Sequence, residues 1–266
     1  MTTLTLNPIA TADPSPRVEL VVSAVDGGVS TVTVLQLSSE GQVVVRNGRR
    51  ISAAGGAFLV DYEVPLGVPV EYRLEQFNGA GTSLGFTSPV STQVDIPIGM
   101  VVIQDPLAPA NAVMLRAERS FAETTGFKRS LQLYPSGNDT IALMGERGLL
   151  DSVNLSVIAE ADDDQTTLDA ILAEGTLLVR TMPPMPVPRA LHVVIDSPRR
   201  VPFDAHWGGQ VSVYQLEGSQ VSMLPLDIIV PVVTWQRVID AYPTWTALMA
   251  AHATWLDLIK NPPPEV

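Results

Sequence analysis

The chain has 266 residues, and its 16 basic and 28 acidic residues give a formal net charge of −12. This acidic balance argues against a nucleic-acid-binding protein, because such proteins present basic surfaces to phosphates. The absence of cysteine excludes disulfides, thiolate metal sites and cysteine nucleophiles, and three histidines are too few for a histidine-rich metal site. Hydrophobic residues make up 46% of the chain, enough for a core, while 19 glycines and 22 prolines predict many turns.

The N-terminal residues 1–16 lack the basic and apolar regions of a secretory signal peptide. The longest apolar stretches, residues 96–103 and 224–233, fall far short of the roughly 20 residues that a membrane helix needs. We therefore expect a soluble protein that is made in the cytoplasm and does not insert into membranes.

Residues 1–103 predict a first β domain. Short segments rich in β-branched and aromatic residues alternate with glycine turns, and Asn47-Gly48 and Asn78-Gly79 are strong hairpin signals because both residue types tolerate positive φ. We expect strands at residues 18–23, 29–37, 58–63, 69–77 and within 83–94. Several short strands without a helical period favour a β-sandwich.

One part of this domain resembles a fibronectin type III or immunoglobulin-like module. The resemblance rests on the strand and hairpin of residues 70–79, with Tyr72 near the start of the strand, followed by Ser88-Pro89-Val90-Ser91. It implies a two-sheet sandwich for the first domain.

Residues 104–233 predict a second β domain with one inserted helix, and Pro97 and Pro106 bracket a linker or edge segment before it. We expect strands at residues 112–117, 127–134, 151–158, 176–181, 191–196, 210–216 and 223–230. The helix is expected near residues 164–174, where Asp162, Asp163 and Asp164 offer N-cap oxygens and favourable charge, and Gly175 is placed to end it. This pattern favours a β-sandwich or barrel.

Residues 234–266 hold a Thr-Trp repeat with a spacing of ten residues, followed by a proline-rich tail. The repeat predicts several short helices that begin at Thr N-caps, each turning its Trp toward a common centre. Such a small unit must cover the chain's own core or contact another subunit. The candidate assembly contacts are Trp235, Trp245, Trp255, Val238, Leu248 and Leu258.

The order of the pieces between residues 141 and 260 resembles minor tail proteins of long-tailed bacteriophages of actinobacteria. The matching pieces are Gly145-Glu146-Arg147, the helix and strand of 167–183, the segment 224–231 and the repeat of 234–259. By this resemblance, the second domain has the β-sandwich of tail-tube and distal-tail proteins, which assemble as rings.

The resemblance implies a non-enzymatic structural protein of the virion tail tip, assembled in the host cytoplasm. Its expected partners are copies of itself in a ring such as a hexamer or trimer, and other tail proteins such as the tail tube, tail tip and tape measure. The alternative is a module that binds a host receptor or cell-wall glycan, for which Trp207, beside Gly208 and Gly209, is the candidate contact.

The sequence offers little support for catalysis. Gly81-Thr82-Ser83-Leu84-Gly85 matches the G-x-S-x-G motif of hydrolases, but it follows a hairpin signal and precedes an expected strand, where a turn is the simpler interpretation. Consecutive aspartates before a helix are more simply caps than calcium ligands. We therefore predict no catalytic residue, no metal site and no cofactor.

Overall fold

The computed structural model describes residues 2–12, 15–127, 131–136, 139–144, 148–203, 210–223, 235–242 and 244–252, together with residues 255, 258 and 263. This part of the chain contains 22 strands and three helices, so the prediction of a mainly β protein is confirmed. None of its helices is long and apolar enough to span a bilayer.

The first domain is built from two sheets that share one hydrophobic core. One sheet has the order β1-β2-β6, and the other has β4-β3-β7-β8 with β5 and β9 pairing to β3 and β7. The strands are β1 (Thr3–Ile9), β2 (Arg17–Ser23), β3 (Thr31–Ser38), β4 (Gly41–Val44), β5 (Ile51–Ser52), β6 (Ala57–Asp61), β7 (Val70–Phe77), β8 (Ser83–Phe86) and β9 (Val90–Thr92). Alternate residues such as Leu20, Leu59, Val34 and Leu74 meet between the sheets.

The second domain is a nine-stranded sheet with the order β16-β22-β19-β18-β10-β11-β17-β21-β20. Its strands are β10 (Met100–Gln104), β11 (Ala112–Ala117), β16 (Val153–Asn154), β17 (Val157–Ala159), β18 (Leu177–Arg180), β19 (Ala190–Ile195), β20 (Arg199–Pro202), β21 (Ser212–Gln215) and β22 (Glu217–Gln220). Helix α1 (Asp162–Leu172) covers one face, where Leu168 and Ile171 join the core of this domain.

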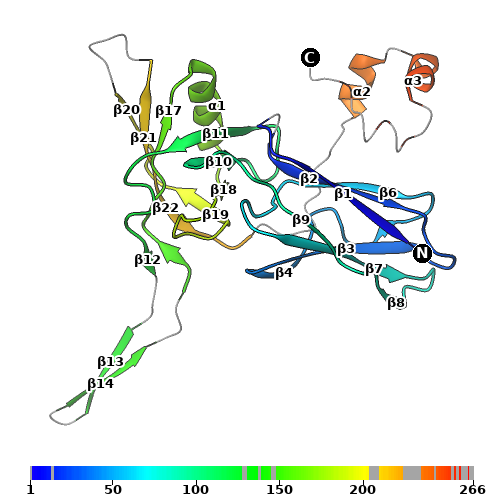
Figure 1. Cartoon of the computed structure of the whole chain (residues 1–266). Helices are drawn as coiled ribbons and strands as arrows, with labels where there is room; N and C mark the ends of the chain where they lie inside the picture. The colour runs from blue at the N-terminus through cyan, green and yellow to red at the C-terminus, as the bar shows by residue number, and fades with distance from the viewer. Residues whose placement is uncertain are drawn as a thin grey trace.

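Two further parts extend from these domains (Figure 1). The short strands β12 (Gly126–Phe127) and β15 (Leu150–Asp151) pair at the base of a long ribbon formed by β13 (Leu131–Ser136) and β14 (Asp139–Met144). The C-terminal helices α2 (Trp235–Ala241) and α3 (Trp245–Ala251) stand apart from the strands.

Both faces of the nine-stranded sheet are covered at its centre, which explains why β18 is buried along its whole length. Successive side chains of a strand point to opposite faces. In β18, Leu177 and Val179 enter the core beneath α1, while Arg180 faces the first domain. Similarly, Val102 of β10 contributes to the core of the first domain. Around β10 and β18, the second face of the sheet is therefore the seam between the two domains.

Arg180 is the polar centre of this seam. Its guanidinium is fully buried and donates hydrogen bonds to the Ser15 hydroxyl at 2.5 Å, the Pro16 carbonyl at 2.7 Å and the Gln104 side-chain carbonyl at 2.7 Å. A longer bond of 3.4 Å reaches the Val64 carbonyl. Burial lowers the Arg180 pKa to about 10, against the effect of two nearby carboxylates, so the side chain stays charged at neutral pH.

The seam is also closely packed beside Arg180. Gly67 has a φ of +70°, and a Cβ at this position would lie 2.7 Å from Cδ of Pro183 in the second domain. Only glycine fits there without displacing the neighbouring chain, because the position requires both a left-handed backbone and close approach.

The predicted boundary after residue 103 is wrong in one respect, because it divides β10. Its five residues pair with β11 and β18 near the middle of the nine-stranded sheet, so the segment expected as a linker or edge is a central strand. The strand expected at 151–158 is divided into β15, β16 and β17. Helix α1 begins after Ala161 without a side-chain cap, so the three aspartates occupy its first turn, and it ends at a cap on Ala173.

We predict that Arg180→Ala destabilises the folded protein by about 3–5 kcal/mol, because it leaves several buried acceptors without their charged donor. Chemical denaturation followed by circular dichroism measures this change. The control is Arg116→Ala, which breaks an exposed ion pair with Glu160 and should cost less than about 1 kcal/mol. Equal costs for the two variants would contradict the role assigned to Arg180.

Candidate functional site

A cavity of about 400 Å³, lined by both apolar and polar side chains, lies at the seam between the domains. Its lining includes Asp61 and Glu63 from the first domain and His192 from β19. Asp61 accepts hydrogen bonds from the Tyr72 hydroxyl and the Gln36 amide, both at 2.7 Å. Burial raises the pKa of Asp61 and also that of Glu63.

The carboxylates of this cavity are engaged by neighbouring side chains. Glu63 pairs with Arg46 at 2.5 Å, and both side chains are nearly buried. His192 is only 8% exposed, and its Nε2 has no hydrogen-bond partner among the described residues. Because the acidic groups already bond to Arg46, Tyr72 and Gln36, the arrangement favours a structural role at the seam over a reactive one.

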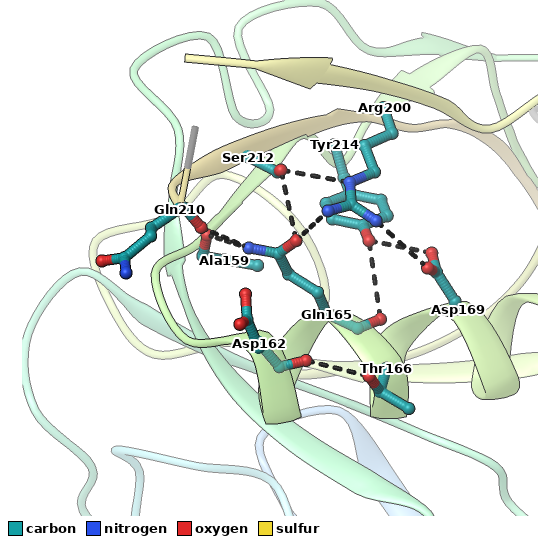
Figure 2. Close-up of polar contacts among 9 residues, drawn as sticks. All are labelled: Ala159, Asp162, Gln165, Thr166, Asp169, Arg200, Gln210, Ser212 and Tyr214. Atoms are coloured by element: carbon teal, nitrogen blue, oxygen red, sulfur yellow. Dashed lines mark hydrogen bonds and ion pairs between the residues drawn. The ribbon is translucent and has the colours of Figure 1, made fainter. Parts of the chain in front are cut away.

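A second polar network fixes the β20–β21 hairpin onto α1 (Figure 2). Gln165 of α1 is buried, and its side-chain amide N–H donates to the Gln210 backbone carbonyl at 2.5 Å. The side-chain carbonyl of Gln165 accepts a hydrogen bond from Arg200 of β20. The Tyr214 hydroxyl donates to Asp169 at 2.8 Å, and Arg200 lies 3.6 Å from the same carboxylate. Burial, together with the bond to Asp169, raises the Tyr214 pKa to about 12, so the hydroxyl keeps its proton.

The described side chains of the β13–β14 ribbon are exposed, and they lie on both of its faces. In its register Tyr134 pairs with Ile141 and Ala142 pairs with Leu133, so Tyr134 and Ala142 point to opposite faces. Tyr134 is 48% exposed, and Ala142 is also exposed. An isolated two-stranded hairpin is at best marginally stable in water. The ribbon therefore presents a surface that another chain could cover.

The C-terminal helices form a small unit with a core of its own. Val238, Leu248 and Leu258 are buried and pack together with Tyr242. Helix α3 begins at Thr244, whose hydroxyl accepts a hydrogen bond from the Ala247 N–H at 3.2 Å, so the predicted Thr cap is confirmed at this repeat. The Tyr242 hydroxyl and His252 Nε2 lie 2.8 Å apart and connect the two ends of α3.

The arrangement of the repeat differs from the sequence prediction. The residue three positions after each Trp forms the common centre, whereas Trp245 and Trp255 are 59% and 53% exposed. Their rings lie beside each other with centroids 5.6 Å apart. Three of the predicted assembly contacts, Val238, Leu248 and Leu258, thus face the unit's interior. Trp235 begins α2, but its side chain lies outside the described structure.

The remaining sequence candidates are placed as follows. Trp207, the predicted glycan contact, lies outside the described residues, as do the segments 145–147 and 224–231 that contributed to the phage-tail resemblance. Ser83 of the G-x-S-x-G match begins β8 directly after the hairpin turn. Among the described residues, no group of three or more His, Asp or Glu side chains is placed to hold a metal ion.

Sequence reasoning missed three features that the structure brings forward: the ribbon, Arg180 and His192. The Pro135-to-Asn138 turn signals a hairpin, and a strand was predicted on its N-terminal side only. No local pattern distinguishes Arg180 or His192 from surface residues, since their burial depends on the first domain.

Comparisons with family models, curated proteins and solved structures find no match.

We predict that His192 makes the folded state sensitive to acid. Burial and the nearby Arg46 charge lower the His192 pKa from 6.5 to about 4, so folding favours the neutral ring. Its contribution to stability is complete above pH 6.5 and is lost as the pH falls toward about 4. Between pH 7.5 and 4.5, the wild type should lose about 1–3 kcal/mol more stability than His192→Gln.

Denaturation at a series of pH values measures this difference. The titrations of Asp61 and Glu63 occur in both proteins and cancel in the comparison. Parallel stability profiles for the two proteins would show that His192 does not titrate differently on folding.

Proposed function

We propose that this chain is a non-enzymatic structural component of a phage tail tip, of the minor-tail or distal-tail kind, that assembles with copies of itself and with other tail proteins. The observation that carries the proposal is the β13–β14 ribbon, which is exposed on both faces at Tyr134 and Ala142. A ribbon of this kind gains stability when a neighbouring chain covers one face or extends its edge.

The remainder of the structure anchors the base of the ribbon. The β12–β15 pair closes its base, and β15 lies beside β22 of the nine-stranded sheet. That sheet is itself held on the first domain through Arg180 and the close packing at Gly67. When the ribbon of one copy contacts a different surface of the next copy, the interface is heterologous, and it closes into a ring if the rotation permits.

The immunoglobulin-like or fibronectin-like character of the first domain, and the tail-tube character of the second, belong to the same proposal. The two facing sheets of the first domain around a shared core agree with a sandwich. In the second domain, the single helix against one face agrees with the expected β domain with an inserted helix. Virion location, tail-tube or tape-measure contacts and ring symmetry follow from the resemblance described for the sequence.

A host-glycan-binding module is the second candidate, and one groove favours it. Hydroxyl, amide and carboxylate side chains line a groove of about 860 Å³ beside β21 and β22, among them Ser120, Asn154 and Glu118. However, Asn154 donates to Ser120, and Ser120 donates to Glu118, so these groups already bond to one another. Purified host cell-wall polysaccharide that binds the wild type but not Trp207→Ala would support this candidate.

We predict that replacing residues 128–147 with a short Gly-Ser linker abolishes the assembly that depends on the ribbon and leaves both domains folded. The β12–β15 pair still closes the base, and both hydrophobic cores lie outside the deleted segment except for contacts at its margin. Sedimentation velocity over a range of concentrations measures assembly, and circular dichroism measures folding. Oligomers larger than a dimer should form in the wild type and disappear in the variant.

Two point variants identify the face that is covered. Tyr134→Asp and Ala142→Asp place a charge on opposite faces of the ribbon, so the one on the covered face should weaken assembly at least about tenfold, equivalent to 1.4 kcal/mol. A wild type that remains monomeric at all concentrations, alone and with other tail proteins, contradicts the proposal.

A further inference from the structure

The C-terminal helical unit carries an apolar face that is distinct from its core. Four large side chains on it remain exposed, namely Ile239, Trp245, Met249 and Trp255, and Met249 is the most exposed of them at 74%. Trp and Met are enriched where proteins bind one another. Solitary apolar residues are common on protein surfaces, but two neighbouring Trp rings with Met and Ile in one small unit mark an interaction site.

The repeat places this face and the core on different sides of the same short helices. Residues three positions after each Trp are buried at Val238, Leu248 and Leu258, while Trp245, Trp255 and the residues four positions after Trp, Ile239 and Met249, are exposed. One repeating pattern thus builds an inner apolar set and an outer apolar set. The outer set contributes nothing to the unit's own core.

The inner core that the described residues form is small. Within the described residues it consists of three buried aliphatic side chains and the partly buried Tyr242, with no member from either β domain. Helical units of this size need additional burial, which pairing with another unit supplies. Burying the outer face would provide it.

The available area suits pairing with a second copy. A buried Trp removes roughly 150–250 Å² from water, so the four side chains, each more than half exposed, leave roughly 500 Å² per copy. Complete burial of two such faces would remove roughly 1,000 Å² from water, which reaches the lower limit for a specific interface. None of the four side chains carries a charge, so two identical faces can meet without repulsion, as in the apolar interfaces of homodimers.

We propose that the faces formed by Ile239, Trp245, Met249 and Trp255 of two copies pack against each other, so that two helical hairpins associate into one bundle. The contact is isologous, since the same patch is used by both copies. It is separate from the ribbon contact of the proposed function. One chain would therefore carry two independent assembly surfaces.

The absence of cysteine makes a direct test available. Met249→Cys introduces a single thiol into the full-length chain at the exposed face, and a two-fold contact brings the thiols of two copies close together. The control is Ile98→Cys, a highly exposed position in the turn before β10. Under mild oxidation, Met249→Cys should form a covalent dimer at least about tenfold faster than the control, because the second thiol is already held nearby.

Sedimentation equilibrium of Trp245→Ala provides the second measurement. The variant should raise the dissociation constant of the dimer at least about tenfold, whereas Phe203→Ala, which removes an exposed aromatic ring elsewhere, should leave it unchanged. Both experiments are repeated with residues 128–147 replaced by the linker, so that ribbon-mediated assembly cannot mask the result. The proposed pairing predicts that the dimer persists in this background.

Two outcomes would overturn the inference. Equal cross-linking rates for Met249→Cys and Ile98→Cys would show that the faces of two copies do not meet. A linker variant that is strictly monomeric, and in which the thiol introduced by Met249→Cys reacts rapidly with maleimide, would show that this face is left for a different occupant. Loss of ribbon assembly with retention of the dimer, or the reverse, separates this inference from the proposed function.

Discussion

A single buried guanidinium makes the two β domains act as one body. Arg180 comes from β18 of the second domain, and its acceptors include Ser15 and Pro16 of the first. Burying a positive charge without partners would be very costly, so these acceptors and the nearby acidic side chains must all be in place. The relative position of the domains is therefore tied to the hydrogen bonding of this group.

The packing of the two domains also determines which surfaces remain available to contact other chains. At its centre, the nine-stranded sheet is covered by α1 on one face and by the first domain on the other, so the central strands cannot use those faces for assembly. The surfaces that remain exposed include the groove beside β21 and β22 and the projecting β13–β14 ribbon. A projecting ribbon is useful for assembly only if its base is rigid, and the buried seam provides that rigidity. The residues that stabilise the two packed domains are thus different from the residues that are proposed to contact other chains.

The sequence was informative where local rules decide the structure. The alternation of residues 112–117 predicts β11 with the observed bounds, and the Thr cap at Thr244 and the stripe of Leu168 and Ile171 follow from helix spacing. It was misleading where burial depends on distant parts of the chain. Residues 100–104 are flanked by prolines and look like a linker, but they form a central strand because β11 and β18 pair with both of its edges.

For the candidate surfaces, too, the sequence predicted the local pattern but not the burial that depends on packing. The ten-residue repeat was recognisable, but periodicity alone could not say whether Trp or the residue three positions later is buried, because both are apolar. Packing decided it: the aliphatic side chains of Val238, Leu248 and Leu258 fit a small centre, and the larger Trp245 and Trp255 lie outside it. Arg180 could not be recognised from its neighbours in sequence, since its partners lie more than 70 residues away.

Hydrogen–deuterium exchange of residues 131–144 tests the central claim most directly, namely that the ribbon is covered by another chain. In dilute monomeric protein, both faces are exposed and the ribbon amides should exchange rapidly. At concentrations where larger species form, the same amides should become protected while exchange in the two hydrophobic cores stays unchanged. Rapid exchange of the ribbon in the assembled protein would contradict the account.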